Sequence, residues 1–277
     1  MTSRSSKSVQ EILFHLNELA PLSQSESWDN VGLLLGDPTW KTPGAVISVD
    51  LTQEALDLAA AHQIQLVITH HPCIFPQSKG VTNLVAGSLA FEAIRRGIAV
   101  ASYHTNFDRC ALQVVESISQ GLQVNPQGRL HDNSADQALD SGKGLQKGFG
   151  YGFWGEFTCP RPFSELLKDV TTVFNVNGFW ITKPTPSFVT RVGFSAGKGT
   201  SFVESAASVK CDVFITGEVG YHHALQGTRL GMTVIELGHR ESEKFFIETM
   251  RSWLLDLGLK VIEVRTPTQM IFSGGMK

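Results

Sequence analysis

Histidine is the residue type whose placement in this sequence points most directly to chemistry. The chain has nine histidines, and six of them follow short apolar runs that are typical of buried strands. These six are His70, His71, His104, His222, His223 and His239. In open α/β sheets, ligands bind beyond the carboxyl ends of the strands, where loops from separate strands converge. We therefore expect imidazoles from distant parts of the chain to gather at a site of this kind.

The first pair, His70 and His71, precedes Pro72, which restricts His71 to an extended conformation. Adjacent residues of an extended segment point to opposite faces, so both rings reach a single metal ion with difficulty. Two ions about 3.5–4 Å apart could each take one ring. Histidine is the commonest metal ligand, which favours a metal site over the alternative of two hydrogen-bonded rings in a loop.

His104 and Asp108 lie four residues apart after the next predicted strand. A carboxylate has two oxygens, so Asp108 could bridge two metal ions. His104 then suits proton transfer or an orienting role around the metals. The same segment is equally consistent with Asp108 capping the following helix. We predict Asp108 as a metal ligand and His104 as a catalytic residue.

His239 and Glu243 are spaced to lie on one face of a helix, with Cβ atoms about 5–6 Å apart. The start of a helix disfavours the protonated imidazole, which leaves a ring nitrogen able to bind a metal. An exposed helical pair is the alternative interpretation. We predict both residues as metal ligands, and Glu218, after another predicted strand, as a second catalytic residue.

Three further segments carry polar groups with less definite geometry. His222 and His223 are expected around the site rather than on a metal. Asp50 follows the first predicted strand, where a turn or capping role is favoured over a place beside the site. The glycine-rich segment 197–199 could cradle a phosphate at a helix start. It lacks the Walker spacing, which favours a simple glycine turn.

The elements that position these residues alternate between short apolar runs and amphipathic segments, which predicts βαβ units and an α/β fold. Strands are expected at residues 45–49, 64–68, 98–102, 191–194, 211–215 and 232–236. Helices are expected at residues 53–61, 85–95, 110–120, 160–174 and 241–257. Residues 131–150 are rich in Asp, Ser, Gly, Gln and Lys, which predicts a surface loop or a domain boundary.

The totals describe an ordinary globular chain whose 277 residues suggest about two domains. A net charge of −3 does not indicate the excess of Lys and Arg that binding to a phosphate backbone requires, so nucleic-acid binding is disfavoured. Four cysteines without a C-x-x-C pair argue against a thiolate zinc site or a disulfide framework. Without a secretory segment or an apolar run near the ~20 residues of a membrane span, we expect a cytoplasmic protein with no membrane contact.

Five motifs, in matching order along the chain, resemble those of the NGG-one-interacting-factor-three-like family, which is also the GTP cyclohydrolase I type 2 family. They are Trp28-Asp-Asn-Val-Gly-Leu33, His70-His71-Pro72, His104-Thr-Asn-Phe-Asp108, Thr216-Gly-Glu218, and Gly238-His239 with Glu243. The resemblance implies metal ligands at His70, His71, Asp108, His239 and Glu243. This set agrees with the one argued from the chemistry of the residues.

The resemblance also implies two interleaved α/β domains with mixed, largely parallel sheets. Residues 1–130 with 238–277 would form the metal-binding domain and residues 131–237 the inserted one, with the metal site at strand carboxyl ends between them. A toroidal homohexamer is implied as the assembly. The nitrogen and oxygen ligands suit two divalent ions of zinc, iron, manganese or nickel.

Three functions remain open at this stage. The first is a dinuclear metal-dependent hydrolase, in which the metals acidify a water to a pKa of about 7. For this hydrolase the resemblance implies a nucleotide substrate, with attack on C8 of the purine of GTP and release of formate. The second is a dinuclear phosphoesterase. The third is a non-catalytic protein that binds metal or a partner, because a shared fold does not fix a reaction.

Overall fold

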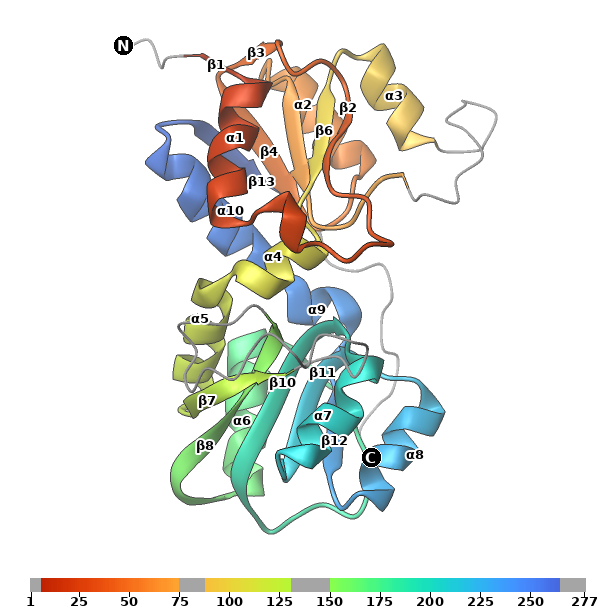
Figure 1. Ribbon diagram of the computed structural model, residues 1–277, viewed down its shortest axis with the longest axis vertical. Coiled ribbons are helices and arrows are strands. Elements are labelled where there is room, and N and C mark those ends of the chain that lie inside the picture. Colours follow the sequence, from red (N-terminus) through yellow and green to blue (C-terminus); the bar gives the residue numbers. More distant parts are fainter. Residues whose placement is uncertain (1–5, 75–87, 131–149, 265–277) are drawn as a thin grey trace. The chain divides into compact units, whose positions relative to one another are not determined.

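The computed structural model describes residues 6–74, 88–130 and 150–264, which divide into two units (Figure 1). The first unit contains the chain up to Ala111 and again from Phe245, and the second contains the stretch Leu112–Lys244 between them. In each unit helices accompany a β-sheet, so the predicted α/β fold is confirmed. The predicted loop at residues 131–150 lies outside the described residues except at its last position.

The first unit is built on a five-stranded sheet in the order β13-β4-β5-β6-β2. Its strands are β2 (Gly32–Leu35), β4 (Gly44–Ser48), β5 (Leu66–Thr69), β6 (Ala99–Ser102) and β13 (Lys260–Glu263). The first four strands in that order run parallel, and β2 pairs antiparallel with β6. Every residue of β4, β5 and β6 is buried, as is typical of parallel strands covered on both faces. The carboxyl ends of these three strands therefore share one edge.

The helices of the first unit lie on both sides of this sheet (Figure 1). They are α1 (Val9–Leu19), the short helix η1 (Leu22–Gln24), α2 (Gln53–Ala61), α3 (Leu89–Arg95), α4 (Thr105–Cys110) and α10 (Phe245–Asp256). α2 and α3 pack Leu56 and Ala93 into a core with Val67 and Val100 of the sheet. A two-stranded pair of β1 (Lys7–Ser8) and β3 (Lys41–Thr42) completes the unit. The central strands of the sheet are thus buried, and polar side chains can reach solvent or a ligand only beyond the strand ends.

The second unit has a six-stranded sheet in the order β7-β8-β10-β11-β12-β9. Its strands are β7 (Asn125–Leu130), β8 (Tyr151–Pro162), β9 (Trp180–Ile181), β10 (Phe188–Lys198), β11 (Val213–Glu218) and β12 (Thr233–Glu236). β10, β11 and β12 run parallel, and the other pairs are antiparallel. Its helices are α5 (Leu112–Leu122), α6 (Phe163–Phe174), η3 (Gly199–Phe202), α7 (Val203–Ser208), α8 (Tyr221–Arg229) and α9 (His239–Glu243). Both sheets are mixed, and the first is the more parallel of the two.

The chain divides at other positions than the sequence suggested. Residues 112–130 and 238–244 belong to the second unit. The reason is backbone pairing, because β7 is bonded to β8 and Gly238 donates its N–H to the carbonyl of Gly217 in β11. The helix expected at residues 241–257 is accordingly two helices, α9 in the second unit and α10 in the first. Among the described helices, none combines the length and the apolar character needed to cross a bilayer.

Candidate metal centre

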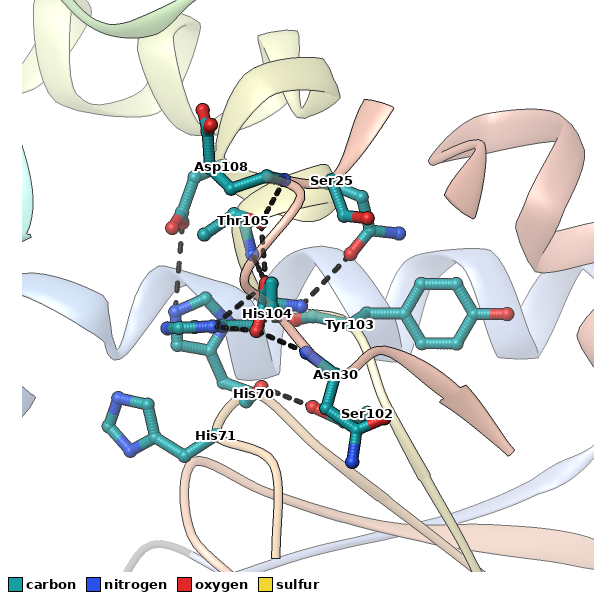
Figure 2. Close-up of polar contacts among 12 residues, drawn as sticks. Ser25, Asn30, His70, His71, Ser102, Tyr103, His104, Thr105 and Asp108 are labelled. Carbon is teal, nitrogen blue, oxygen red and sulfur yellow. Dashed lines mark hydrogen bonds and ion pairs between the residues drawn. The ribbon is translucent and has the colours of Figure 1, made fainter. Parts of the chain in front are cut away.

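Three histidines of the first unit follow neighbouring parallel strands. His70 and His71 come directly after β5, and His104 comes two residues after β6. Their ring centroids lie 5.2 Å apart for His70 and His71, 5.1 Å for His70 and His104, and 5.6 Å for His71 and His104. Each ring offers a nitrogen within 4.8 Å of the others, and Figure 2 shows the three side chains together. This strand-end cluster could hold a metal ion.

Each of these three rings is held through Nδ1 by an oxygen. Nδ1 of His70 lies 2.9 Å from the carbonyl oxygen of Tyr103, Nδ1 of His71 lies 2.7 Å from Asp50, and Nδ1 of His104 lies 2.9 Å from Asp29. Carbonyl and ionised carboxylate oxygens accept hydrogen bonds, so Nδ1 carries the proton in each bond. The lone pair of a neutral ring is then on Nε2. This is the arrangement that metal-ligating histidines usually have.

Asp108 adds a carboxylate beside His70. It lies in the first turn of α4, where its backbone N–H bonds to the carbonyl of His104. One carboxylate oxygen lies 3.6 Å from Nε2 of His70, the contact drawn as a dashed line in Figure 2. His104 is the N-cap residue of α4, and its own side chain makes no capping bond.

Aromatic side chains enclose His70, whose side chain is 1% exposed. Phe246 of α10 and Phe107 of α4 have ring centroids 5.1 Å and 5.9 Å from that of His70, and 4.9 Å from each other. The hydroxyl of Ser102 donates to the backbone carbonyl of His70 at 2.6 Å. His70 is therefore fixed from both its backbone and its ring. An apolar wall of this kind strengthens electrostatic interactions at the ring by lowering the local dielectric.

A second set of polar side chains lies in the second unit. Nδ1 of His239 lies 3.1 Å from Glu218 at the end of β11, and Nε2 of His239 lies 3.1 Å from Glu243. Glu243 is almost fully buried, with 5% of its side chain exposed, whereas 38% of the His239 side chain is exposed. His239 thus repeats the pattern of the first unit, since Nδ1 is held by an oxygen and Nε2 lies beside a carboxylate.

The glycine-rich segment 197–199 lies against this second set. It is the end of β10 and the start of η3, and Gly197 has a positive φ of 59°. The backbone N–H of Gly197 donates to the hydroxyl of Ser242, which in turn donates to the carbonyl of His239. The pairing of β10 with β11 shifts register between Ser195 and Lys198, so Gly197 lies at an irregularity near the end of the strand. Its position beside α9 was not apparent from the sequence.

Two carboxylates have roles that the sequence analysis missed or ranked second. Asp50 contacts His71, although a turn or capping role had been favoured. Asp29 was assigned no role, yet it bonds His104 and its side chain is 1% exposed. The signal for Asp29 was its place in the Trp28–Leu33 motif. His222 and His223 are exposed at the start of α8, where the ring of His222 packs edge-on against Tyr221.

The donor chemistry of both sets fits divalent metal ions. Imidazole nitrogen and carboxylate oxygen suit zinc, iron, manganese and nickel. In the first unit an oxygen holds Nδ1 of each histidine ring, so Nε2 is the nitrogen that could bind a metal, and in the second unit the buried carboxylate of Glu243 lies beside Nε2 of His239. The structure thus describes an α/β protein with histidine and carboxylate clusters at strand ends.

The chain belongs to the Duf34/NIF3 (NGG1p interacting factor 3) family, whose model matches residues 7–269. It is 28% identical over 262 residues to a GTP cyclohydrolase 1 type 2 homolog of Campylobacter jejuni, covering 92% of this chain and 95% of that protein. It is 30% identical over 249 residues to GTP cyclohydrolase 1 type 2 of Helicobacter pylori, covering 86% and 88%. The family resemblance stated from the motifs is therefore confirmed.

A solved structure supports the fold over almost the whole chain. The Bacillus cereus protein related to NIF3 has a TM-score of 0.83 at 18% identity, and the match covers 97% of this chain and 99% of that one. At this identity the likeness concerns the fold alone. It agrees with the mixed α/β architecture described above.

Proposed function

We propose that this chain is a divalent-metal-dependent hydrolase whose ligands are His70, His71 and Asp108 in the first unit and His239 and Glu243 in the second. The observation that supports this most is the shared bonding of the histidines. His70, His71 and His239 each have Nδ1 on an oxygen, as metal ligands usually do. We further propose that the chain binds two divalent ions, because five ligands are too many for a single ion of an open catalytic site.

Divalent ions bound by these residues would supply Lewis-acid activation and a water that ionises near neutral pH. The chain supplies proton transfer and orientation. His104, fixed through Nδ1, accepts a proton at Nε2 and delivers it to the leaving nitrogen. Glu218 was predicted as a second catalytic residue, and its bond to Nδ1 of His239 favours an orienting role in this proposal.

For the substrate we propose a purine nucleoside triphosphate. The Helicobacter pylori relative carries the name GTP cyclohydrolase 1 type 2 and the Campylobacter jejuni relative is named as its homolog, which motivates attack on C8 of the purine, opening of the imidazole ring and release of formate. One feature of this chain supports a planar substrate. Trp28 is 57% exposed, with its ring 6.2 Å from that of His104, and an aromatic face of this kind stacks well on a base.

The test of this function uses purified protein loaded separately with zinc, manganese, iron or nickel. Formate release and ultraviolet spectra report ring opening of GTP, and inorganic phosphate and a chromogenic phosphoester report phosphoester hydrolysis. The expected result is formate release that His70→Ala abolishes. Release of phosphate without formate would show that the substrate is a phosphoester and not the purine ring. Background rates with every metal and substrate would show that the protein binds metal without catalysing either reaction.

The proposed assembly is a homohexamer, as the family resemblance implied. Light scattering after gel filtration measures the mass of the assembly directly. A mass near six chains of 30.3 kDa is the expected result, and a monomer would remove this part of the proposal.

A further inference from the structure

Asp29 is a buried carboxylate outside the proposed ligand set. It lies in the segment before β2, and only 1% of its side chain is exposed. Its oxygens lie 2.9 Å and 3.1 Å from Nδ1 of His104. The backbone N–H of Thr105 donates to Asp29 at 3.1 Å, and the hydroxyl of Thr105 donates to the same oxygen. The backbone N–H of Asn30 donates to the other oxygen at 2.8 Å, so four donors converge on one carboxylate.

The carboxylate is ionised at neutral pH. Burial acts to raise the pKa of Asp29, but the hydrogen bond and charge of His104 and the two hydrogen bonds of Thr105 outweigh it and lower the pKa to about 2. An ionised carboxylate only accepts hydrogen bonds. The proton between Asp29 and His104 therefore belongs to Nδ1 of His104, so that whenever the ring is neutral its lone pair is on Nε2.

The tautomer of His104 matters because this residue belongs to the strand-end cluster. His104 offers a nitrogen within 4.8 Å of those of His70 and His71, and Nδ1 is the nitrogen that Asp29 holds. Thr105, the second partner of Asp29, is the first residue of α4, the helix that carries Asp108. One buried carboxylate thus fixes both the ring of His104 and the start of that helix.

We propose that Asp29 is a positioning residue that keeps His104 in the Nδ1–H tautomer, so that Nε2 serves as the proton acceptor of the strand-end cluster. The use of Nε2 in catalysis rests on the proposed function, whereas the tautomer is a property of the chain alone. The change Asp29→Asn is the direct test. Thr105 directs two donors at one oxygen position and Asn30 directs one at the other, so the amide oxygen is expected on the Thr105 side, with loss of the Asn30 bond. The amide NH₂ then faces Nδ1 of His104 and shifts the ring proton to Nε2.

The primary readout is a nitrogen-15 spectrum of the histidine rings in metal-free protein at mildly alkaline pH, assigned with His104→Gln. The native protein is expected to show His104 as the Nδ1–H tautomer, and Asp29→Asn to show the Nε2–H tautomer with a cooperative thermal transition. Asp50→Asn is the matched control, because it makes the same chemical change beside His71 and should leave the His104 signals unchanged.

The native spectrum alone can overturn the proposal, since an Nε2–H ring at His104 contradicts it whether or not Asp29→Asn folds. An unchanged His104 tautomer in folded Asp29→Asn also contradicts it. In metal-loaded protein with measurable turnover, Asp29→Asn is expected to lower kcat roughly 10²–10⁴-fold with little change in KM. Absence of turnover in the native protein would refute the proposed function and leave the tautomer result standing.

Discussion

Gly197 stands directly against the carboxylate of Glu243: a Cβ added at Gly197 would lie 2.3 Å from Oε1 of Glu243. Gly197 also has a positive φ, which other residues adopt at a cost. The contact atom is the end of a flexible side chain, so a larger residue would displace Glu243 rather than the backbone. The glycine at the end of β10 therefore makes room for a proposed metal ligand.

Gly197→Ala is expected to weaken metal binding by moving Glu243, and to lower the free energy of unfolding by about 1–2 kcal/mol through its backbone conformation. Gly231→Ala is the matched control, because Gly231 has a φ of 82° and no atom within 4 Å of an added Cβ. The control should show the loss of stability without the loss of metal affinity. Equal metal affinities in the two variants would contradict a role for Glu243. Isothermal titration and urea unfolding provide both quantities.

Acid should remove the stabilisation that Asp29 gains in the folded state. Its pKa is lowered from 3.8 to about 2, below its value in the unfolded chain. The stabilisation is therefore complete above about pH 4 and is lost as the pH falls toward 2, with a size on the order of 2 kcal/mol. Native protein and Asp29→Asn should differ most in urea unfolding at neutral pH and converge over that interval. A difference that stays constant with pH would exclude the titration of Asp29 as its source.

Glu218→Gln tests how His239 is oriented. Because Glu218 holds Nδ1 of His239 from an exposed position, the substitution should lower metal affinity roughly 10-fold and leave the stability of metal-free protein unchanged. Glu204→Gln makes the same change at another exposed carboxylate of the second unit, one that contacts Gln226, and should leave metal affinity unchanged. If both variants bind metal as the native protein does, Glu218 does not act through His239.

Trp28→Ala tests the proposed aromatic face for a purine. The exposed ring contributes little to folding, so the variant is expected to keep its thermal transition. Loss of stacking on a base costs about 1–3 kcal/mol, which should raise the KM for GTP by roughly 10-fold or more with a smaller effect on kcat. Trp28→Phe should restore most of the affinity. An unchanged KM in steady-state kinetics of Trp28→Ala would place the base elsewhere.

Local patterns in the sequence predicted much of the fold. Thr52 as N-cap placed α2 at its observed residues, 53–61, and the strands expected at residues 45–49 and 98–102 lie within one residue of β4 and β6. Strong apolar runs and caps are local signals, which is why they can be interpreted without the tertiary structure. They also placed His70, His71 and His104 at the ends of neighbouring strands.

Features that depend on pairing between distant segments were not predictable in this way. The apolar spacing from Phe246 to Trp253 predicts one helix over residues 241–257, but it does not reveal that the residue before α9, Gly238, is bonded to the second sheet. The bond from Asp29 to His104 joins residues 75 positions apart, and Asp29 has no periodic or capping signal. Sequence spacing identified groups with suitable chemistry, and only the folded backbone identified which oxygen holds which ring.

The most direct test of the proposed metal centre is the metal content of the purified chain and of three variants, His70→Ala, His239→Ala and His223→Ala, by elemental analysis after dialysis against each divalent metal. The account predicts about two ions per native chain, the loss of at least one ion in each of the first two variants, and full occupancy in His223→Ala. Native protein that retains no divalent metal, or His70→Ala and His239→Ala chains that retain the native content, would contradict it.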